Sequence, residues 1–374
     1  MHIHRIDPGN LRDVGRFVAF PFHLYRGHPQ WVPPFVHEAR AELDPRRHPF
    51  YQHSEAAFFL ALSEGSVLGR LAVLDNRRYN QLHGERTAWF YRFDAVDDPA
   101  VSRALFDAGF DWARGRGLDR LWGPKGLAHT DGQGLLIEGF EHRPAIGIPY
   151  NYPYYATLLE DVGFEKKLDF LSWYMDRQLN FPERFLEVAE RVRQRRGYRS
   201  LVYATKDEVR AVIPQVTTVY NDAFKGVQGF VPLSQAEAEA IGDRILSIAD
   251  PKLISLLMRG DELIGFVLAY PDISAALQRC RGRLWPLGWF HLLREFRRTR
   301  WININGMGIL EKHRGLGGNA LLYAELYRIL IGHPQYDFAD LVQIQETNQR
   351  IFQEMEAIGV KAWKTHRMFQ RSLA

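Results

Sequence analysis

Cysteine is almost absent from this chain of 374 residues, because Cys280 is the single one. An internal disulfide is therefore impossible, and with 46% hydrophobic and 25% charged residues the composition excludes a disulfide scaffold, a collagen-like repeat and a disordered chain. No apolar run approaches the ~18 residues of a membrane-spanning helix. The first residues, MHIHRIDPGN, lack the basic, apolar and small-residue order of a signal peptide. We therefore expect a globular protein of the reducing cytoplasm.

The net charge of the chain is also small. The 48 Lys and Arg residues are nearly balanced by 44 Asp and Glu residues, which leaves a net charge of +4. This excess is too small to indicate a nucleic-acid-binding protein by itself, so nucleic acid is not the expected partner. The length exceeds the ~100–200 residues of a typical domain, and we expect two domains of similar size.

The sequence repeats one plan in its two halves. Residues 58–74 and 253–268 each read as two strands around a polar turn, and the helix ends at 158–164 and 354–360 match each other at a spacing of 196 positions. Each half therefore predicts helices, a hairpin and then alternating strands and helices, which pack as an α/β or α+β sheet flanked by helices. The boundary falls near residues 176–198, where a charged helix follows the first copy.

A glycine-rich segment of the second half predicts a phosphate-binding loop. Gly315, Gly317 and Gly318 follow a predicted strand and precede a predicted helix, whose first N–H groups attract anions. Lys312 and Arg314 add positive charge. The spacing does not fit a dinucleotide-binding or Walker A loop. A tight strand-to-helix turn without a ligand remains an equal alternative.

The order of elements and the run from Arg314 to Asn319 resemble the GNAT superfamily of acyl-CoA N-acyltransferases, whose signature is Arg/Gln-x-x-Gly-x-Gly/Ala. Asn319 departs from that signature. The resemblance implies two tandem GNAT-like domains, each with a mixed, mostly antiparallel sheet: 1–178, degenerate and without the phosphate loop, and 198–374, with the loop. The implied acyl-CoA-binding residues are Gly308, Ile309, Leu310, Lys312, Arg314, Gly315, Gly317, Gly318 and Asn319. In the first half, carboxylates at Asp94, Asp97 and Asp98 occupy the corresponding position and would repel coenzyme A.

The same resemblance implies transfer of an acyl group from a thioester to an amine, with acyl-CoA as co-substrate and no metal. A backbone N–H near Gly308 or Ile309 would polarise the thioester carbonyl. The tyrosine that often protonates the thiolate is replaced by Met355, and Glu346 and Asn348 are the first candidates for catalytic residues. A helix cap is an equal alternative for these two residues.

The first half carries an insertion over 123–155 that is rich in glycine, tyrosine and polar residues. His129 and Asp131 could form a base with its orienting carboxylate, because histidine titrates near neutral pH. Tyr150, Asn151, Tyr154 and Tyr155 could line an elongated substrate pocket, or pack a domain interface.

The second half carries an insertion over 278–301 in which arginines flank an apolar centre. Trp, Phe and Arg side chains of this kind are typical of an interfacial segment on an anionic membrane. The predicted membrane-contact residues are Trp285, Trp289, Phe290, Arg297 and Arg298. The segment could instead bind RNA or be an ordinary capping helix.

Within tandem GNAT proteins, Gly123-Pro124, Gly134-Leu135-Leu136 and the Tyr150–Tyr155 run are similar to the group that includes bacterial ceramide synthases. This resemblance implies transfer of a long acyl chain to the amine of a sphingoid-type lipid, in sphingolipid biosynthesis, by a peripheral enzyme on the cytoplasmic face of the inner membrane. The alternatives are acetyl transfer from acetyl-CoA to a soluble amine, and a non-catalytic acyl-CoA-binding protein.

Overall fold

The computed structural model describes residues 1–128, 131–314 and 317–373. The elements of the first half are β1 (His2–Arg5), α1 (Leu11–Leu24), α2 (Val36–Ala41), β2 (Glu55–Ser63), β3 (Ser66–Asp75), α3 (Arg77–His83), β4 (Thr87–Ala95), α4 (Pro99–Arg114), β5 (Arg120–Gly123), β6 (Leu135–Glu138), α5 (Tyr155–Asp161) and β7 (Glu165–Asp176). Helix α6 (Glu183–Arg196) connects the halves.

The second half repeats this order. Its elements are β8 (Tyr198–Leu201), α7 (Lys206–Ala211), α8 (Ile213–Ala223), α9 (Gln235–Ile248), β9 (Ile254–Arg259), β10 (Glu262–Pro271), α10 (Ser274–Cys280), α11 (Gly288–Phe296), β11 (Trp301–Ile309), α12 (Gly318–Gly332), β12 (Phe338–Gln345), α13 (Gln349–Ile358) and β13 (Lys361–Ser372). Short 3-10 turns cover Pro49–Gln52, Pro251–Leu253 and Glu311–His313.

The predicted repeat is present in the structure. Both hairpins form, as β2–β3 and β9–β10, and the last strands β7 and β13 begin 196 positions apart at Glu165 and Lys361. Helices α7 and α9 begin with the capping boxes expected at Thr205 and Ser234. The short strands β1 and β8, which open the two halves, were not predicted, since four residues carry little periodic signal.

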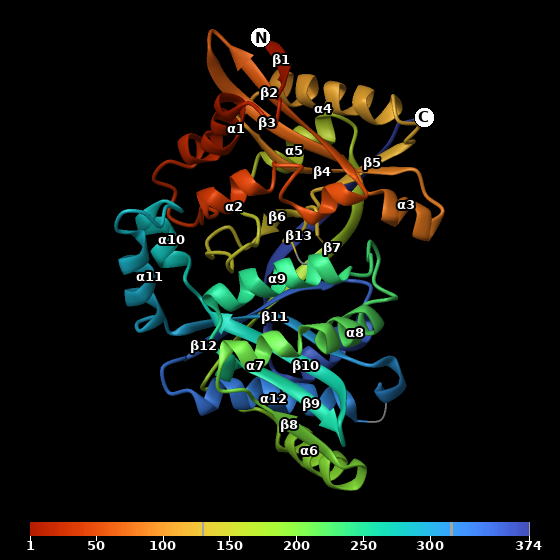
Figure 1. Cartoon of the computed structure of the whole chain (residues 1–374), viewed down its shortest axis with the longest axis vertical. Helices are drawn as coiled ribbons and strands as arrows, with labels where there is room; N and C mark the ends of the chain where they lie inside the picture. Colours follow the sequence, from red (N-terminus) through yellow and green to blue (C-terminus); the bar gives the residue numbers. More distant parts are fainter. Residues whose placement is uncertain (129–130, 315–316, 374) are drawn as a thin grey trace.

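The described residues form one 13-stranded mixed sheet instead of two separate sheets. Its order is β1-β2-β3-β4-β5-β13-β7-β12-β11-β10-β9-β8, with β6 also paired to β13. The last strand of each half is therefore hydrogen-bonded into the sheet of the other half: β13 pairs with β5, and β7 pairs with β12. Both chain ends lie in the first half as a result (Figure 1). This exchange fixes the two halves against each other.

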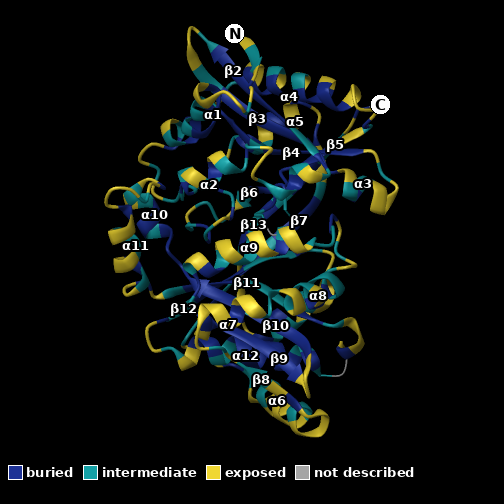
Figure 2. Cartoon of the chain, in the orientation of Figure 1, coloured by how far each residue is buried: buried dark blue, intermediate teal, exposed yellow. Residues whose placement is uncertain are grey.

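Helices cover both faces of the sheet, and the buried strands run through both halves (Figure 2). In the first half α4 packs on β3, where a Cβ atom at Gly69 would lie 2.8 Å from Cδ1 of Leu105. Glycine is required there because the helix approaches the strand closely. The equivalent glycine of the second half, Gly265, lies on β10 beside Gly308 of β11.

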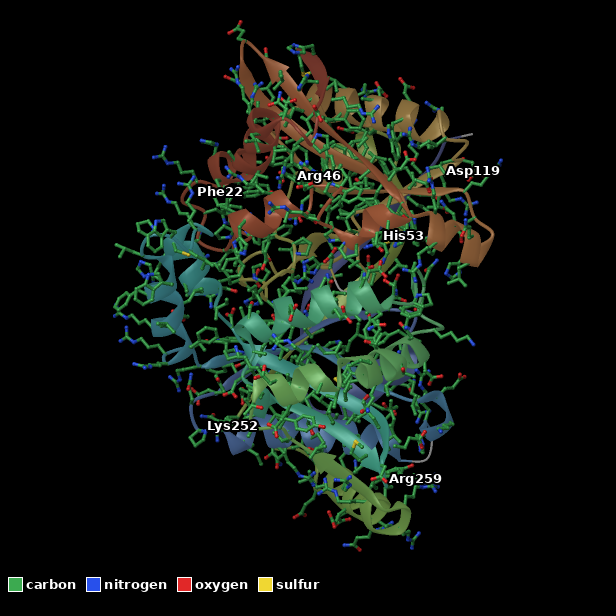
Figure 3. The ribbon with its side chains drawn as sticks, in the orientation of Figure 1. Phe22, Arg46, His53, Asp119, Lys252 and Arg259 are labelled. Carbon is green, nitrogen blue, oxygen red and sulfur yellow. The ribbon has the colours of Figure 1, made fainter. Side chains whose placement is uncertain are left out.

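Polar side chains join the two halves in front of the sheet. The carboxylate of Glu237 on α9 accepts from Nη1 of Arg78 at 2.6 Å and lies 3.3 Å from Nε2 of His53. His53 lies at the level where the halves meet (Figure 3). Although burial raises it, these hydrogen bonds and those from Ser234 lower the pKa of Glu237 to about 2, so the carboxylate is ionised in its ion pair with Arg78.

Candidate functional site

The parallel strands β11 and β12 separate midway along their length. Their pairing runs from Trp301 opposite Phe338 to Ile304 opposite Leu341, although β11 continues to Ile309. The register of β11 against β10 shifts at this point, which leaves Asn305 as an extra residue in the strand. A bulge of this kind bends a strand away from its partner. The separated strand ends lead towards the start of α12.

The N-terminus of α12 carries no side-chain cap in the described residues. Its N-cap is Gly317, at φ 87°, and Gly318 is so close to β11 that a Cβ atom there would lie 2.3 Å from Cδ1 of Ile309. The first N–H groups of the helix therefore have no capping oxygen of their own, as an anion-binding helix start requires. Gly315, which was predicted to belong to this loop, lies outside the described residues.

The helix start of the first half that corresponds to the start of α12 is the start of α4, and a side chain already caps it. The carboxylate of Asp98 caps α4 by accepting from the backbone N–H of Ala100 at 2.8 Å. The side chain of Asp94 is buried, where it forms an ion pair with Arg70 at 2.7 Å and accepts from the hydroxyl of Tyr25 at 3.0 Å. An acid already satisfies this helix end, which leaves the second half as the copy with an open N-terminus.

The predicted cofactor-binding side chains have contacts within the chain. Lys312 forms an exposed ion pair with Glu262 at 2.5 Å, and the guanidinium of Arg314 donates to the backbone carbonyl of Ala223 at the end of α8. Asn319 donates to the carboxylate of Glu354 at 3.1 Å. Gly308 and Ile309 pair with β10, and the N–H of Leu310 donates to the carbonyl of Ile264 at 2.8 Å. Their role in binding a thioester remains a prediction.

The candidate catalytic residues at the end of β12 have structural partners. Glu346 accepts from the backbone N–H of Asp169 at 2.9 Å and pairs with Lys166 at 2.9 Å. Asn348 caps α13 by accepting from the N–H of Ile351 at 3.4 Å. Met355 is 1% exposed and belongs to the core of the second half. Asn348 thus makes the helix cap that was the alternative, whereas Glu346 contacts β7. The catalytic role of both residues stays a prediction.

The insertion of the first half reaches the second half. Asp131 accepts from the backbone N–H of Ala128 at 2.9 Å, and its other oxygen lies 3.5 Å from Nη1 of Arg244 on α9. His129, its predicted partner, lies outside the described residues. The carboxylate that was predicted to orient a base therefore faces the junction between the halves.

The predicted substrate-binding residues that follow pack within the first half. Tyr150 donates to the carbonyl of Phe140 at 3.1 Å, and the side chain of Asn151 bonds both backbone groups of Leu136. Tyr154 donates to the carbonyl of Ala95 at 2.8 Å, and Tyr155 accepts from the N–H of the same residue at 3.1 Å. Tyr154 and Tyr155 thus bond the end of β4 before the capped start of α4, whereas Tyr150 and Asn151 hold the insertion itself. Substrate contact by the four residues remains a prediction.

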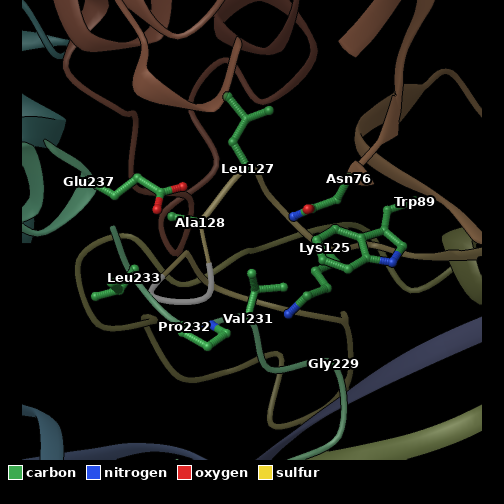
Figure 4. Close-up of a pocket in the computed structure, with 10 residues that line it drawn as sticks. All are labelled: Asn76, Trp89, Lys125, Leu127, Ala128, Gly229, Val231, Pro232, Leu233 and Glu237. Carbon is green, nitrogen blue, oxygen red and sulfur yellow. The ribbon is translucent and has the colours of Figure 1, made fainter. Parts of the chain in front are cut away.

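Sequence reasoning missed Lys125, which is 1% exposed at the junction of the halves. Its Nζ donates to Oε1 of Gln133 at 3.1 Å and lies 5.0 Å from the centre of the Trp89 ring, and no described acidic side chain forms an ion pair with it. Figure 4 shows Lys125 extending towards Gly229 and Val231 of the second half. Burial lowers its pKa to about 7, against a smaller raising effect of Asp131. A lone lysine in sequence carries no signal of burial.

The insertion of the second half presents an apolar surface to solvent. Trp285, Leu287, Trp289, Phe290 and Leu293 are 49 to 83% exposed. Exposed arginines without an ion-pair partner among the described residues surround them, namely Arg281, Arg283, Arg294, Arg297 and Arg298. The opposite side of α10 and α11 packs on Phe35 of the first half.

In the described chain no helix is both long enough and apolar enough to cross a membrane. Within the same residues, no group of three or more His, Cys, Asp or Glu side chains is arranged to hold a metal ion.

The two halves, each with separating parallel strands before a helix, define a tandem GNAT fold, which confirms the fold predicted from the resemblance. The solved tandem GNAT protein from the clavulanic acid biosynthesis pathway aligns with 100% of this chain and 98% of its own, at a TM-score of 0.58 and 13% identity. A GCN5-related N-acetyltransferase from Anabaena variabilis aligns with 100% of this chain and 72% of its own, at a TM-score of 0.53 and 10% identity.

Two curated proteins are similar over nearly their full length. The bacterial ceramide synthase of Caulobacter vibrioides is 27% identical over 373 residues, covering 96% of this chain and 95% of its own. Protein YghO of Escherichia coli is 28% identical over 370 residues, covering 97% and 94%. No family model matches the chain.

Proposed function

We propose that this protein is an N-acyltransferase that takes its acyl group from an acyl-CoA thioester bound by the second half. The observation that carries the proposal is the start of α12, which has no side-chain cap among the described residues and packs against Ile309 at the separated end of β11. The first N–H groups of α12 would bind the pyrophosphate, with Arg314 and Lys312 beside them. The pantetheine would follow β11 between the separated strands. The first half has no such opening, because Asp98 caps α4.

The proposed acceptor is the amine of a lipid of the sphingoid type, and the acyl chain is long. Similarity to a bacterial ceramide synthase over 96% of this chain supports this substrate class. The exposed apolar residues of α11 support it independently, since a lipid amine must be collected from a membrane surface. The surrounding arginines favour an anionic surface, and we place the protein on the cytoplasmic face of the inner membrane.

The first experiment is native mass spectrometry of the purified full chain with acetyl-CoA and with palmitoyl-CoA, followed by sphinganine. We expect retention of palmitoyl-CoA and formation of the N-acyl product with release of free coenzyme A. Retention of acetyl-CoA alone would replace the lipid acceptor by a soluble amine. Retention of palmitoyl-CoA without transfer to any amine would favour a non-catalytic acyl-CoA-binding protein, and no retention of either thioester would refute the proposed site.

A further inference from the structure

Hydrogen bonds connect Lys125, through Gln133, to the part of β12 that is separated from β11. The backbone N–H of Gln133, the hydrogen-bond partner of Lys125, donates to Oε1 of Gln343 at 2.9 Å, and Nε2 of Gln343 donates back to the carbonyl of Gln133. Gln343 lies two residues beyond Leu341, where the pairing of β12 with β11 ends. The first half therefore presents Lys125 at the point where the strands of the second half open.

The loop between α8 and α9 contacts both β12 and Lys125. Nε2 of Gln345, also on β12, donates to the carbonyl of Gln228 at 2.9 Å. The next residue is Gly229, at φ 78°, where a Cβ atom would lie 3.5 Å from Nζ of Lys125. Lys125 thus lies between the opened strand and a loop of the second half, although it is encoded in the first half.

The charged groups around Lys125 do not neutralise it. The nearest acid is Asp131, which lies against Gly126 and is engaged by the N–H of Ala128 and by Arg244. Glu237 lines the same small cavity, but it is paired with Arg78 and His53. Among the described residues, the other polar groups that line the cavity or bond Lys125 are the amides of Asn76, before α3, and Gln133. A buried lysine whose hydrogen-bond partner is an amide is expected to lose its proton more readily than an exposed one.

The cavity next to Lys125 has a volume of about 10 Å³, which is close to the space that one water needs. It is lined from the first half by Trp89 and Leu127 and from the second by Val231 and Leu233. Asn76 and the ion-paired Glu237 also line it. A buried amine that no described acid pairs with suits a base, because burial disfavours the charged form and keeps a free electron pair on the nitrogen.

We propose that Lys125 accepts the proton of the acceptor's ammonium group in the second-half site, through one water in this cavity. The inference rests on the proposed function and names a base for it. The ammonium group of the acceptor loses one proton to Lys125 and becomes a neutral amine. Its nitrogen then bonds to the thioester carbonyl carbon, the carbon–sulfur bond breaks, and the second proton lost by the nitrogen goes to the thiolate. Lys125 finally returns its proton to solvent.

The test is the pH dependence of kcat with palmitoyl-CoA and sphinganine for the wild type, Lys125→Met and Lys125→Arg. We expect kcat of the wild type to rise with pH and to level off near pH 7. In both variants kcat should rise instead around the pKa of the acceptor amine itself, about 2 to 3 pH units higher for an alkylamine. At pH 7.5 kcat should fall by about 10²-fold or more. The dissociation constant of palmitoyl-CoA should change by less than about threefold, because Lys125 is not part of the phosphate loop.

Lys167→Met is the matched control. Lys167 also lies over a tryptophan, 4.2 Å from the centre of the Trp122 ring, and burial lowers its pKa as well, but it does not line the cavity. Its variant should keep the wild-type profile. The inference is overturned if Lys125→Met keeps both the limb near pH 7 and a kcat within about threefold of wild type. Absence of palmitoyl-CoA binding or of product in the wild type would instead refute the proposed function.

Discussion

Removing the buried amine of Lys125 should change how the stability of the protein depends on pH. In the folded chain burial lowers the pKa of Lys125 from 10.5 to about 7. At about 1.4 kcal/mol per pH unit, holding the charged form inside the fold costs roughly 5 kcal/mol. Methionine has a similar length and no charge, so Lys125→Met removes this cost while it loses the hydrogen bond to Gln133, about 1 kcal/mol.

The sign follows from proton binding. Below pH 7 both states hold the proton and the full cost is present. Between about 7 and 10.5 the unfolded chain binds a proton that the folded protein has released, so the stability of the wild type rises with pH through this group. Above pH 10.5 the amine is neutral in both states, so burying the charge no longer costs free energy. The advantage of the variant in free energy of unfolding should therefore shrink by about 2 kcal/mol between pH 7 and pH 9.

Urea unfolding of wild type and Lys125→Met, followed by tryptophan fluorescence at pH 6, 7, 8 and 9, measures this difference. Taking the difference between the two proteins removes the contribution of groups that titrate equally in both. Parallel curves, with a constant difference across this range, would refute the argument, because they would mean that Lys125 holds its proton in the folded protein as it does in the unfolded chain.

Three further changes test other parts of the structure. Arg314→Glu should weaken palmitoyl-CoA binding at least tenfold in calorimetric titration, because it places a negative charge at the uncapped start of α12. Changing Trp285 and Trp289 together to Ser should release the protein from vesicles of anionic lipid in a sedimentation assay, because both side chains are exposed. Lys364→Met should lower the free energy of unfolding by about 3 to 5 kcal/mol in urea at pH 7, because it leaves the buried carboxylate of Asp340 without its cation, which lies 2.5 Å away.

Each change has its own control. Lys252→Glu makes the same charge change at an exposed site away from the loop (Figure 3), and equal weakening by both variants would count against the phosphate site. Leu11→Ser with Leu82→Ser removes two other exposed apolar side chains, and continued sedimentation of the tryptophan variant would argue against α11 as the contact. A further Asp340→Leu change should recover most of the loss in Lys364→Met. No recovery would show that the lysine matters by packing.

The sequence predicted the features that depend on local pattern. The apolar runs on either side of a polar turn in 58–74 and 253–268 predicted both hairpins, and the capping boxes at Thr205 and Ser234 predicted helix starts, because these signals lie within a few residues of each other. The repeat at a spacing of 196 positions defined two copies of one plan, and their resemblance to tandem GNAT proteins gave the fold that the structure has.

Other residues had roles that no local pattern reveals. Glu346 was a candidate because it follows a strand, but its partner Lys166 is 180 positions away. The cap that Asn348 makes on α13 was the alternative that the local sequence offered. The burial of Lys125 depends on a loop of the second half that begins about a hundred residues later. A lysine is solvated by default, so its sequence context predicts a surface residue.

The sequence by itself determined most helices and strands of each half and distinguished the two helix starts, because glycine stands before α12 and Asp98 before α4. The tertiary structure alone decided that β7 and β13 are exchanged between the halves and that Lys125 lies against Gly229 of the other half. The physical reason is that strand sequences set alternation and burial but not the neighbour to which a strand hydrogen-bonds. Two copies of one plan offer equivalent neighbours, and the packing of the whole chain selects between them.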